Sequence, residues 1–181
     1  MIKGCGWIKE GQCGCKEKDL HWQYADQRLL CAQLLKDAVL AYPVDNFARF
    51  DAASKIAVLS VALALHDANI HCAKDKKQDI GILGTSPEGA LDSNLAYFRD
   101  YVGAGRKLGR GNLFIYTLPS SPLAEAAIVF GLQGPIVYMR NLEKPEEDLL
   151  AQAELMVENK EAQAMVVVAW EANRATCHFI A

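Results

Sequence analysis

The sequence predicts an α/β domain built on a mostly parallel, five-stranded sheet with helices on both faces. The first observation is the order strand, helix, strand over residues 135–170. The second is the apolar run MVVVAW at 165–170, which is typical of a strand covered on both faces. The third is Pro145 followed by three acidic residues, a pattern that favours a helix start. A helix between two strands makes the strands parallel and their connection right-handed.

The N-terminal third of the chain is predicted to hold one strand, one loop and two helices. Residues 2–8, IKGCGWI, form the first strand, with glycines where a neighbouring backbone approaches closely. Residues 9–18 form a polar loop, and a helical pattern runs from about residue 20 to residue 41. Asp51 is the expected N-cap of a helix over 52–68, which is apolar nearly all round and therefore predicted to be buried.

The remaining elements follow the same alternation. Residues 80–85, IGILGT, read as a strand, and Ser-Pro-Glu at 86–88 opens a helix that runs to about residue 101. A small-residue helix covers 123–130. The last strand returns antiparallel to the valine-rich strand as a hairpin. The five predicted strands lie near residues 2–8, 80–85, 135–140, 164–170 and 176–180.

Length and composition exclude several classes of protein. The 181 residues are 51% hydrophobic and carry a net charge of −3, which indicates one globular domain over residues 1–181 and argues against a nucleic-acid partner. The longest apolar segment, 56–65, is too short to span a bilayer. Because the N-terminus lacks the apolar core of a signal peptide, we expect a cytoplasmic protein.

The six cysteines are expected to be reduced thiols. Cys13 and Cys15 form a C-x-C pair with Cys5 and His21 nearby, which raises the question of a metal site. Structural zinc sites combine two C-x-x-C pairs, and the chain has no such second pair. We therefore predict no metal site and interpret His66, in the last turn of its helix, as structural.

A glycine-rich basic loop, GAGRKLGRG, occupies residues 103–111. It matches neither the dinucleotide fingerprint nor the P-loop, so no nucleotide cofactor is predicted. Arg106, Lys107 and Arg110 form a candidate site for a phosphate or an acidic carrier protein. The alternative interpretation is a solvated loop without a ligand.

Several segments occur in an order and spacing that are specific when taken together. They are IKGCGWI, the Arg49-Phe50-Asp51 start of the alanine-rich helix with Asp67-Ala68-Asn69 at its end, IGILGTSPEG, NLFIYTLPSSPLAEAAIVFGLQGP and AMVVVAWE. Over nearly the whole chain they resemble the N-terminal half of a beta-ketoacyl synthase. The resemblance implies a thiolase-like fold with its strands in the order 3-2-1-4-5.

The same resemblance locates the position of the catalytic nucleophile. In active members the nucleophilic cysteine lies a fixed number of residues after the proline of the Gly-Pro strand. Counting the same number of residues from Pro135 gives Glu143. No cysteine lies between Cys72 and Cys177, and the second half of the fold, with its catalytic histidines, is not expected here. The related chain length factors carry glutamine at this position and lack condensing activity. We therefore expect no catalytic residue, no cofactor and no condensing activity, with Glu143 serving only as a first-turn acid.

The helix that follows Glu143 is predicted to expose one side to solvent. Residues 143–161 carry seven carboxylates and only two lysines, and burying unpaired carboxylates would be costly. Its apolar residues are expected to face the sheet, and its acids to face solvent. The predicted sheet-facing residues are Leu149, Leu150, Ala153 and Val157, and the predicted exposed residues are Glu147, Glu154 and Glu158.

The strand before Glu143 is predicted to lie at the sheet edge, where unpaired backbone groups seek a partner. Its residues are Ile136, Val137, Tyr138, Met139 and Arg140, with no charge before the arginine. Complete members of the family pair this strand with its copy across a two-fold axis. The resemblance therefore implies a homodimer, or a heterodimer with a full-length ketosynthase.

Three functions remain open from the sequence. The first is a non-catalytic, ketosynthase-like partner or scaffold in fatty-acid or polyketide biosynthesis, which binds a synthase subunit or an acyl carrier protein. The second is an acyl-thioester hydrolase or transferase that uses another residue, such as Glu143 or a cysteine. The third is an acyl-CoA binding module. All three rest on the resemblance of the fold.

Overall fold

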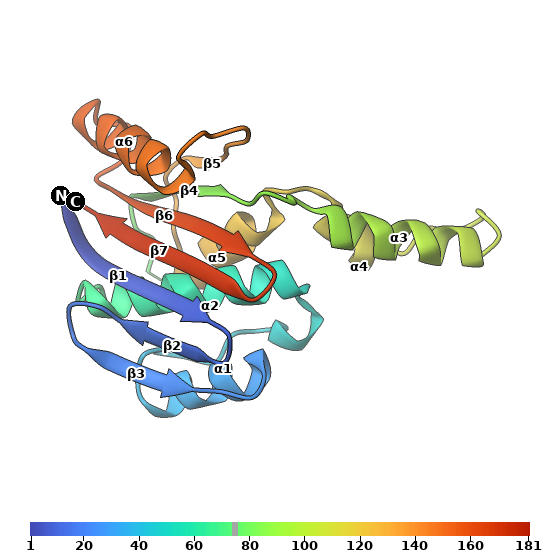
Figure 1. Cartoon of the computed structure of the whole chain (residues 1–181), viewed down its shortest axis with the longest axis horizontal. Coiled ribbons are helices and arrows are strands. Elements are labelled where there is room, and N and C mark those ends of the chain that lie inside the picture. Colours follow the sequence, from blue (N-terminus) through green and yellow to red (C-terminus); the bar gives the residue numbers. More distant parts are fainter. Residues whose placement is uncertain (74–75) are drawn as a thin grey trace.

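The computed structural model describes residues 1–73 and 76–181 (Figure 1). One seven-stranded mixed sheet runs in the order β3-β2-β1-β7-β6-β4-β5. The strands are β1 Ile2–Lys9, β2 Gln12–Cys15, β3 Leu20–Gln23, β4 Ile80–Thr85, β5 Ile136–Tyr138, β6 Ala164–Glu171 and β7 Arg174–Ile180. The α-helices are α1 Gln27–Lys36, α2 Ala52–Asp67, α3 Leu91–Gly103, α4 Gly111–Phe114, α5 Ser121–Phe130 and α6 Pro145–Glu158, with 3-10 turns η1 Phe47–Arg49 and η2 Ile115–Thr117. Figure 1 shows α2 and α5 on one face of the sheet and α6 on the other.

The prediction of a mostly parallel, five-stranded sheet is wrong, because two further strands are present and most strand pairs are antiparallel. The parallel part is confined to β4, which pairs with β5 on one side and β6 on the other. The predicted crossover from β5 through α6 to β6 is therefore present, with β4 lying between its two strands. The predicted hairpin of β6 and β7 is confirmed.

The predicted strand order 3-2-1-4-5 is also wrong, because β1 pairs with β7 and not with β4. The position of β1 depends on its contact with α2, which packs across β1, β7 and β6. A Cβ atom at Gly4 would lie 2.5 Å from the Ala64 carbonyl oxygen, and one at Gly6 would lie 2.6 Å from the Ala64 nitrogen. The close backbone approach predicted at these glycines is confirmed.

The predicted loop at 9–18 and the predicted helix start at residue 20 are both wrong. β1 turns directly into β2, and β2 pairs with β3. The short strand β2 is held by burial of Cys13 and Cys15, which are fully buried and pack with the residues of α2. α1 begins only at Gln27, because the carboxylate of Asp26 accepts hydrogen bonds from the first-turn N–H groups.

Two helices confirm the periodicity predicted for them. α2 is buried along most of its length, and Asp51 caps it by accepting a hydrogen bond from the Ser54 N–H. On α6 the sheet-facing residues are Leu149, Ala153 and Met156, with Leu150 and Val157 half-buried beside them. The predicted acids Glu147, Glu154 and Glu158 are all exposed.

α3 and α4 project from the body as an arm (Figure 1). α3 begins at Leu91 and not at residue 86, because Ser86 is buried and continues the path of β4. Every residue of α3 is at least partly exposed. Among the residues described, no single helix is long and apolar enough to cross a membrane, although α4 and η2 together with α5 meet that length and composition across a bend of 104°.

Candidate functional site

The edge strand β5 forms one part of the candidate site, and its backbone has one paired side and one open side. The Ile82 N–H donates to the Pro135 carbonyl oxygen at 2.8 Å, and the Met139 N–H donates to Gly84 at 2.9 Å. Because backbone groups alternate along a strand, those of Val137 also face β4. The N–H and C=O groups of Ile136 and Tyr138 therefore face away from the sheet.

The side chains of β5 add an apolar surface at this edge. Ile136 is 44% exposed and Val137 is 38% exposed. Tyr138 is half-buried, and its hydroxyl donates to the Ser86 carbonyl oxygen at 2.8 Å. Met139 is half-buried beyond the end of the strand, and Arg140 is exposed. The predicted strand at 135–140 is thus shorter than expected, and its position at the sheet edge is confirmed.

The arm forms the second part of the candidate site. Four apolar residues of α3 recur at helical spacing and are 41–59% exposed, and they form one stripe. These residues are Leu91, Leu95, Phe98 and Val102. Leu108, Phe114, Ile115 and Leu118 extend the exposed apolar surface along the arm. Contiguous apolar surfaces of this kind mark interaction sites on soluble proteins.

The arm and β5 meet at the base of the arm. A Cβ atom at Gly89 would lie 3.4 Å from the Tyr138 hydroxyl and 3.7 Å from Pro119. The segment after β4 is therefore in contact both with the edge strand and with the segment that leads into α5. We call β5 together with the apolar residues of the arm the edge-and-arm surface.

Aromatic contacts and a hydrogen bond join α3 to the α4 and η2 segments of the arm. Tyr97 stacks on Tyr101 with a ring-centroid distance of 6.3 Å and meets the edge of Phe114 at 5.6 Å. The Asn94 side-chain amide donates to the Thr117 carbonyl oxygen at 3.0 Å, so α3 is tied to η2. The exposed stripe of α3 is thus carried by an ordered pair of segments.

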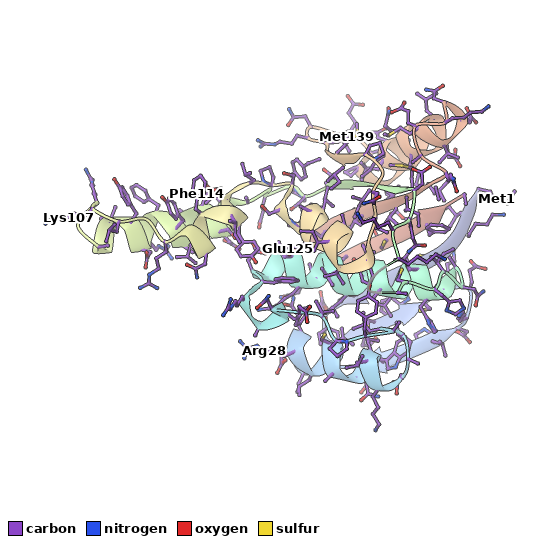
Figure 2. All side chains as sticks on the ribbon, turned by 180° about the vertical axis from the view of Figure 1, so that it is seen from behind. Met1, Arg28, Lys107, Phe114, Glu125 and Met139 are labelled. Atoms are coloured by element: carbon purple, nitrogen blue, oxygen red, sulfur yellow. The ribbon has the colours of Figure 1, made fainter. Side chains whose placement is uncertain are left out.

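The predicted basic site lies at the far end of the arm. Arg106 has a left-handed backbone with φ +61, and Arg106, Lys107 and Arg110 are all exposed. Arg110 pairs with Asp100 at 3.2 Å. Figure 2 labels Lys107 at the tip, well away from Met139 and the sheet. The structure therefore does not bring this loop together with Glu143.

Glu143, at the position that the resemblance assigns to the nucleophile, is exposed and lies just before Pro145. The next residue, Lys144, donates its backbone N–H to the Asp148 carboxylate at 3.1 Å and its ammonium to Glu147 at 3.0 Å. A carboxylate here complements the positive end of the helix dipole. The Glu143 carboxylate is exposed, and within residues 1–73 and 76–181 no neighbouring base of the kind that activates a nucleophile contacts it.

The sequence reasoning missed a polar contact between α6 and the sheet. The Nε2 atom of His178, on β7, lies 2.6 Å from the Glu146 carboxylate in the first turn of α6. His178 is 9% exposed, and its Nδ1 atom is buried without a hydrogen-bond partner among the residues described. The alternation of β7 could have placed His178 on the face toward α6, but nothing in the sequence indicated Glu146 as its partner.

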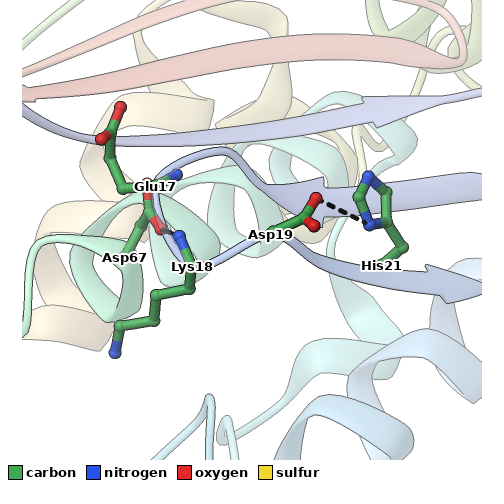
Figure 3. A network of polar contacts seen from close by, with 5 residues as sticks. All are labelled: Glu17, Lys18, Asp19, His21 and Asp67. Carbon is green, nitrogen blue, oxygen red and sulfur yellow. Dashed lines mark hydrogen bonds and ion pairs between the residues drawn. The ribbon is translucent and has the colours of Figure 1, made fainter.

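Asp67, in the segment Asp67-Ala68-Asn69 at the end of α2, has a role that only the structure shows. Asp67 is 2% exposed, and its carboxylate accepts hydrogen bonds from three backbone N–H groups. The donors are Cys5 at 2.8 Å, Glu17 at 3.0 Å and Lys18 at 2.9 Å. Figure 3 shows the carboxylate of Asp67 beside the loop that carries Glu17 and Lys18. Asp67 thus joins the end of α2 to β1 and to the turn between β2 and β3.

The arrangement of a mixed sheet between α2 with α5 and α6, with a crossover through α6, defines a thiolase-like α/β fold. No protein-family model matches the sequence, and no curated protein matches it. Solved structures match with high probability. They include the ishigamide ketosynthase/chain length factor, with TM-score 0.65 and 13% identity over 99% of this chain and 61% of that chain.

Two other solved structures agree with this match. A ketosynthase in complex with its chain length factor from Xenorhabdus doucetiae has TM-score 0.61 and 15% identity, over 99% of this chain and 77% of that chain. A beta-ketoacyl synthase from Burkholderia phymatum has TM-score 0.63 and 11% identity, over 98% of this chain and 57% of that chain. The chain therefore has the fold of the beta-ketoacyl synthases, as the sequence predicted, and it spans 61% of the length of the first of these chains.

Proposed function

We propose that this protein is a non-catalytic, ketosynthase-like subunit that pairs with a full-length ketosynthase through the edge-and-arm surface. Such a subunit would act as a partner or scaffold in fatty-acid or polyketide biosynthesis. Two of the similar structures are described as a ketosynthase with a chain length factor, which supports a role of this kind.

The observation that carries the proposal is the open side of β5, together with the apolar stripe of α3 on an arm whose base contacts Tyr138. An unprotected edge strand can add a strand from a partner through its outward N–H and C=O groups. Neither Ile136 nor Val137 is charged or a proline, which are the residue types that discourage an edge strand from pairing with another chain. Leu95 and Phe98, 41% and 59% exposed, supply apolar area that backbone pairing alone does not provide.

The absence of condensing activity is part of the proposal. In this fold the resemblance assigns the acyl-bearing cysteine to the start of α6, where Glu143 is an exposed carboxylate. Burial raises the pKa of the Cys13 and Cys15 thiols to about 12, and it also raises the pKa of Cys177 well above its usual value. These three thiols are consequently protonated and weakly nucleophilic at neutral pH.

We also propose that the arm tip contacts an acyl carrier protein. Arg106 and Lys107 are exposed cations at the end of an arm that reaches away from the body, a geometry suited to a rim contact with an acidic partner. Charge reversal at Lys107 should slow association with a carrier protein and reduce its salt dependence. An unchanged association rate at low salt would remove this part of the proposal.

The six free cysteines of this chain fit the cytoplasmic location that we propose for it.

Light scattering on this chain mixed with a ketosynthase of the same organism tests the pairing. We expect this protein, of 19.9 kDa, to join the ketosynthase in a stoichiometric complex. A self-pair of this chain, with twice that mass and no complex with the ketosynthase, would reject the heterodimer. Separate, unchanged masses for both proteins would reject the pairing altogether.

A matched pair of variants at Ile136 tests whether β5 forms the contact. Ile136→Pro removes an outward N–H and leaves the hydrogen bonds to β4 in place. Ile136→Val keeps that N–H and changes the side chain little. We expect the proline variant to abolish the complex and the valine variant to retain it. Equal binding by both variants would mean that the partner binds elsewhere.

A further inference from the structure

A cysteine, a histidine and a glutamate gather on the α6 side of the sheet, away from the edge-and-arm surface. Gly4 and Gly6 of β1 meet α2, so the intervening Cys5 and the following Trp7 point to the opposite face. Cys5 is the direct cross-strand partner of His178 on β7. Directly opposite residues of an antiparallel pair have Cβ atoms about 4.5–5.5 Å apart and share one face.

The histidine of this cluster is oriented for use as a base. Its Nε2 atom lies 2.6 Å from the Glu146 carboxylate, which favours the tautomer with a proton on Nε2. The Nδ1 lone pair is then free, and this atom is buried without a partner among the described residues. Carboxylate, imidazole and thiol therefore occur in the order used for nucleophilic acyl transfer. No hydrogen bond joins the Cys5 thiol to Nδ1 in the part of the chain described, and such contacts often tighten only with substrate bound.

A cleft of about 460 Å³ lies near this cluster, and its lining residues are neighbours of Cys5, His178 and Glu146 rather than those three residues themselves. Trp7 and Thr176 line it, and they are the next residues along β1 and β7 on the face of Cys5 and His178. Pro145, which directly precedes Glu146, lines it as well. Pro87 and Ala169 add apolar surface that suits a short acyl chain or an aromatic group. Lys9, Glu171 and Arg174 add charged side chains to the lining.

We propose that Cys5, His178 and Glu146 form a nucleophilic site that accepts an acyl group from an activated ester or thioester bound in this cleft. His178 Nδ1 takes the thiol proton as Cys5 Sγ attacks the carbonyl carbon. The bond from the carbonyl carbon to the leaving oxygen or sulfur then breaks, and the leaving group takes the proton from Nδ1. The products are S-acyl Cys5 and a free alcohol or thiol. Glu146 is a positioning residue, since it acts only through the imidazole.

The environment of the thiol explains why a base is needed. Burial raises the pKa of the Cys5 thiol, with Lys16 opposing this rise and Asp67 and Glu146 adding to it. The resting group is therefore a neutral thiol, and proton transfer to His178 must accompany the attack. The proposal does not depend on pairing with a ketosynthase, so the chain alone suffices to test it.

The test uses the purified, reduced full chain with two probes, p-nitrophenyl hexanoate and hexanoyl-N-acetylcysteamine. We expect one acyl group per chain by intact mass, located on Cys5 by peptide mapping, and no acylation of Cys5→Ser at that peptide. Cys31→Ser is the matched control, because Cys31 is more exposed and has no histidine or carboxylate acting on it among the residues described. The acylation rate of this variant should stay unchanged. Acylation at Cys31 or Cys72 in preference to Cys5, or none with either probe, would overturn the site.

A second comparison tests the role of the imidazole. Loss of a general base costs about a hundredfold or more in rate, so His178→Gln should slow acylation of Cys5 by that factor while leaving thermal unfolding cooperative. If His178→Gln fails to fold, Glu146→Gln reports on the same base from the exposed side of the contact. It should lower the rate and shift its pH profile. Acylation of Cys5 at the wild-type rate in the variant that folds would overturn the assignment of His178 and Glu146.

Discussion

Replacing Asp67 with asparagine should destabilise the protein far more than the same replacement at Asp19. Asp67 is buried and accepts three backbone hydrogen bonds of 2.8–3.0 Å, whereas the side chain of Asp19 is 93% exposed and lies 3.8 Å from His21 (Figure 3). The two changes are chemically identical, and asparagine tolerates the left-handed backbone of Asp19. The comparison therefore isolates the contribution of the buried acceptor.

The magnitude follows from the number and kind of hydrogen bonds. A hydrogen bond to a charged group contributes about 1.5–3 kcal/mol, and an unpaired buried donor costs about 1–3 kcal/mol. Asparagine keeps one acceptor oxygen but turns an NH₂ group toward the remaining donor. We therefore expect Asp67→Asn to lower the free energy of unfolding by about 2–4 kcal/mol, and Asp67→Ala to lower it further. Asp19→Asn should stay within about 0.5 kcal/mol, as surface changes do.

Urea unfolding followed by circular dichroism measures both variants under one set of conditions. The slope with denaturant should not change, so that the shift in midpoint reports stability. If Asp67→Asn and Asp19→Asn differ by less than about 0.5 kcal/mol, the carboxylate does not hold α2 to β1 and to the β2–β3 turn as described.

Three further predictions concern the fold and the missing chemistry. Leu149→Ala should cost about 2–5 kcal/mol, because Leu149 is fully buried under α6, while Glu154→Ala should stay within about 0.5 kcal/mol; equal costs in thermal unfolding would reverse the orientation of α6. Gly6→Ala should cost about 1–3 kcal/mol or more, because its Cβ would lie 2.6 Å from Ala64, and a neutral result would show that α2 does not pack on β1. The purified chain should form no 3-ketoacyl product from malonyl and acyl thioesters, and Glu143→Cys should not restore it; product from either protein would contradict the assignment of a non-catalytic subunit.

Much of the fold could be predicted because several elements carry their own pattern. The valine run of β6 and the all-round apolar α2 are each specific to a buried environment. The apolar stripe of α6 likewise predicted that Leu149 faces the sheet and that Glu154 faces solvent. Leu150 was also predicted to face the sheet, but it lies at the border of the contact and is half-buried.

The missed features depend on contacts between distant residues. β2 has only four residues with two small cysteines, too short for periodicity to separate it from a loop. The pairing of β1 with β7 depends on how α2 crosses the sheet, and no local pattern specifies it. The same holds for the candidate sites. The edge position of β5 followed from the resemblance, whereas the pairing of His178 with Glu146 joins residues 32 apart and required the structure.

Amide exchange along β5 in the presence of a ketosynthase tests the central proposal most directly. The amide of Val137 faces β4 and should exchange slowly whether or not a partner is present. The amides of Ile136 and Tyr138 face the open edge, so they should exchange quickly in the isolated chain and become protected when the ketosynthase is added. If those two amides exchange equally fast with and without the ketosynthase, β5 does not pair with it, and the proposed function is wrong.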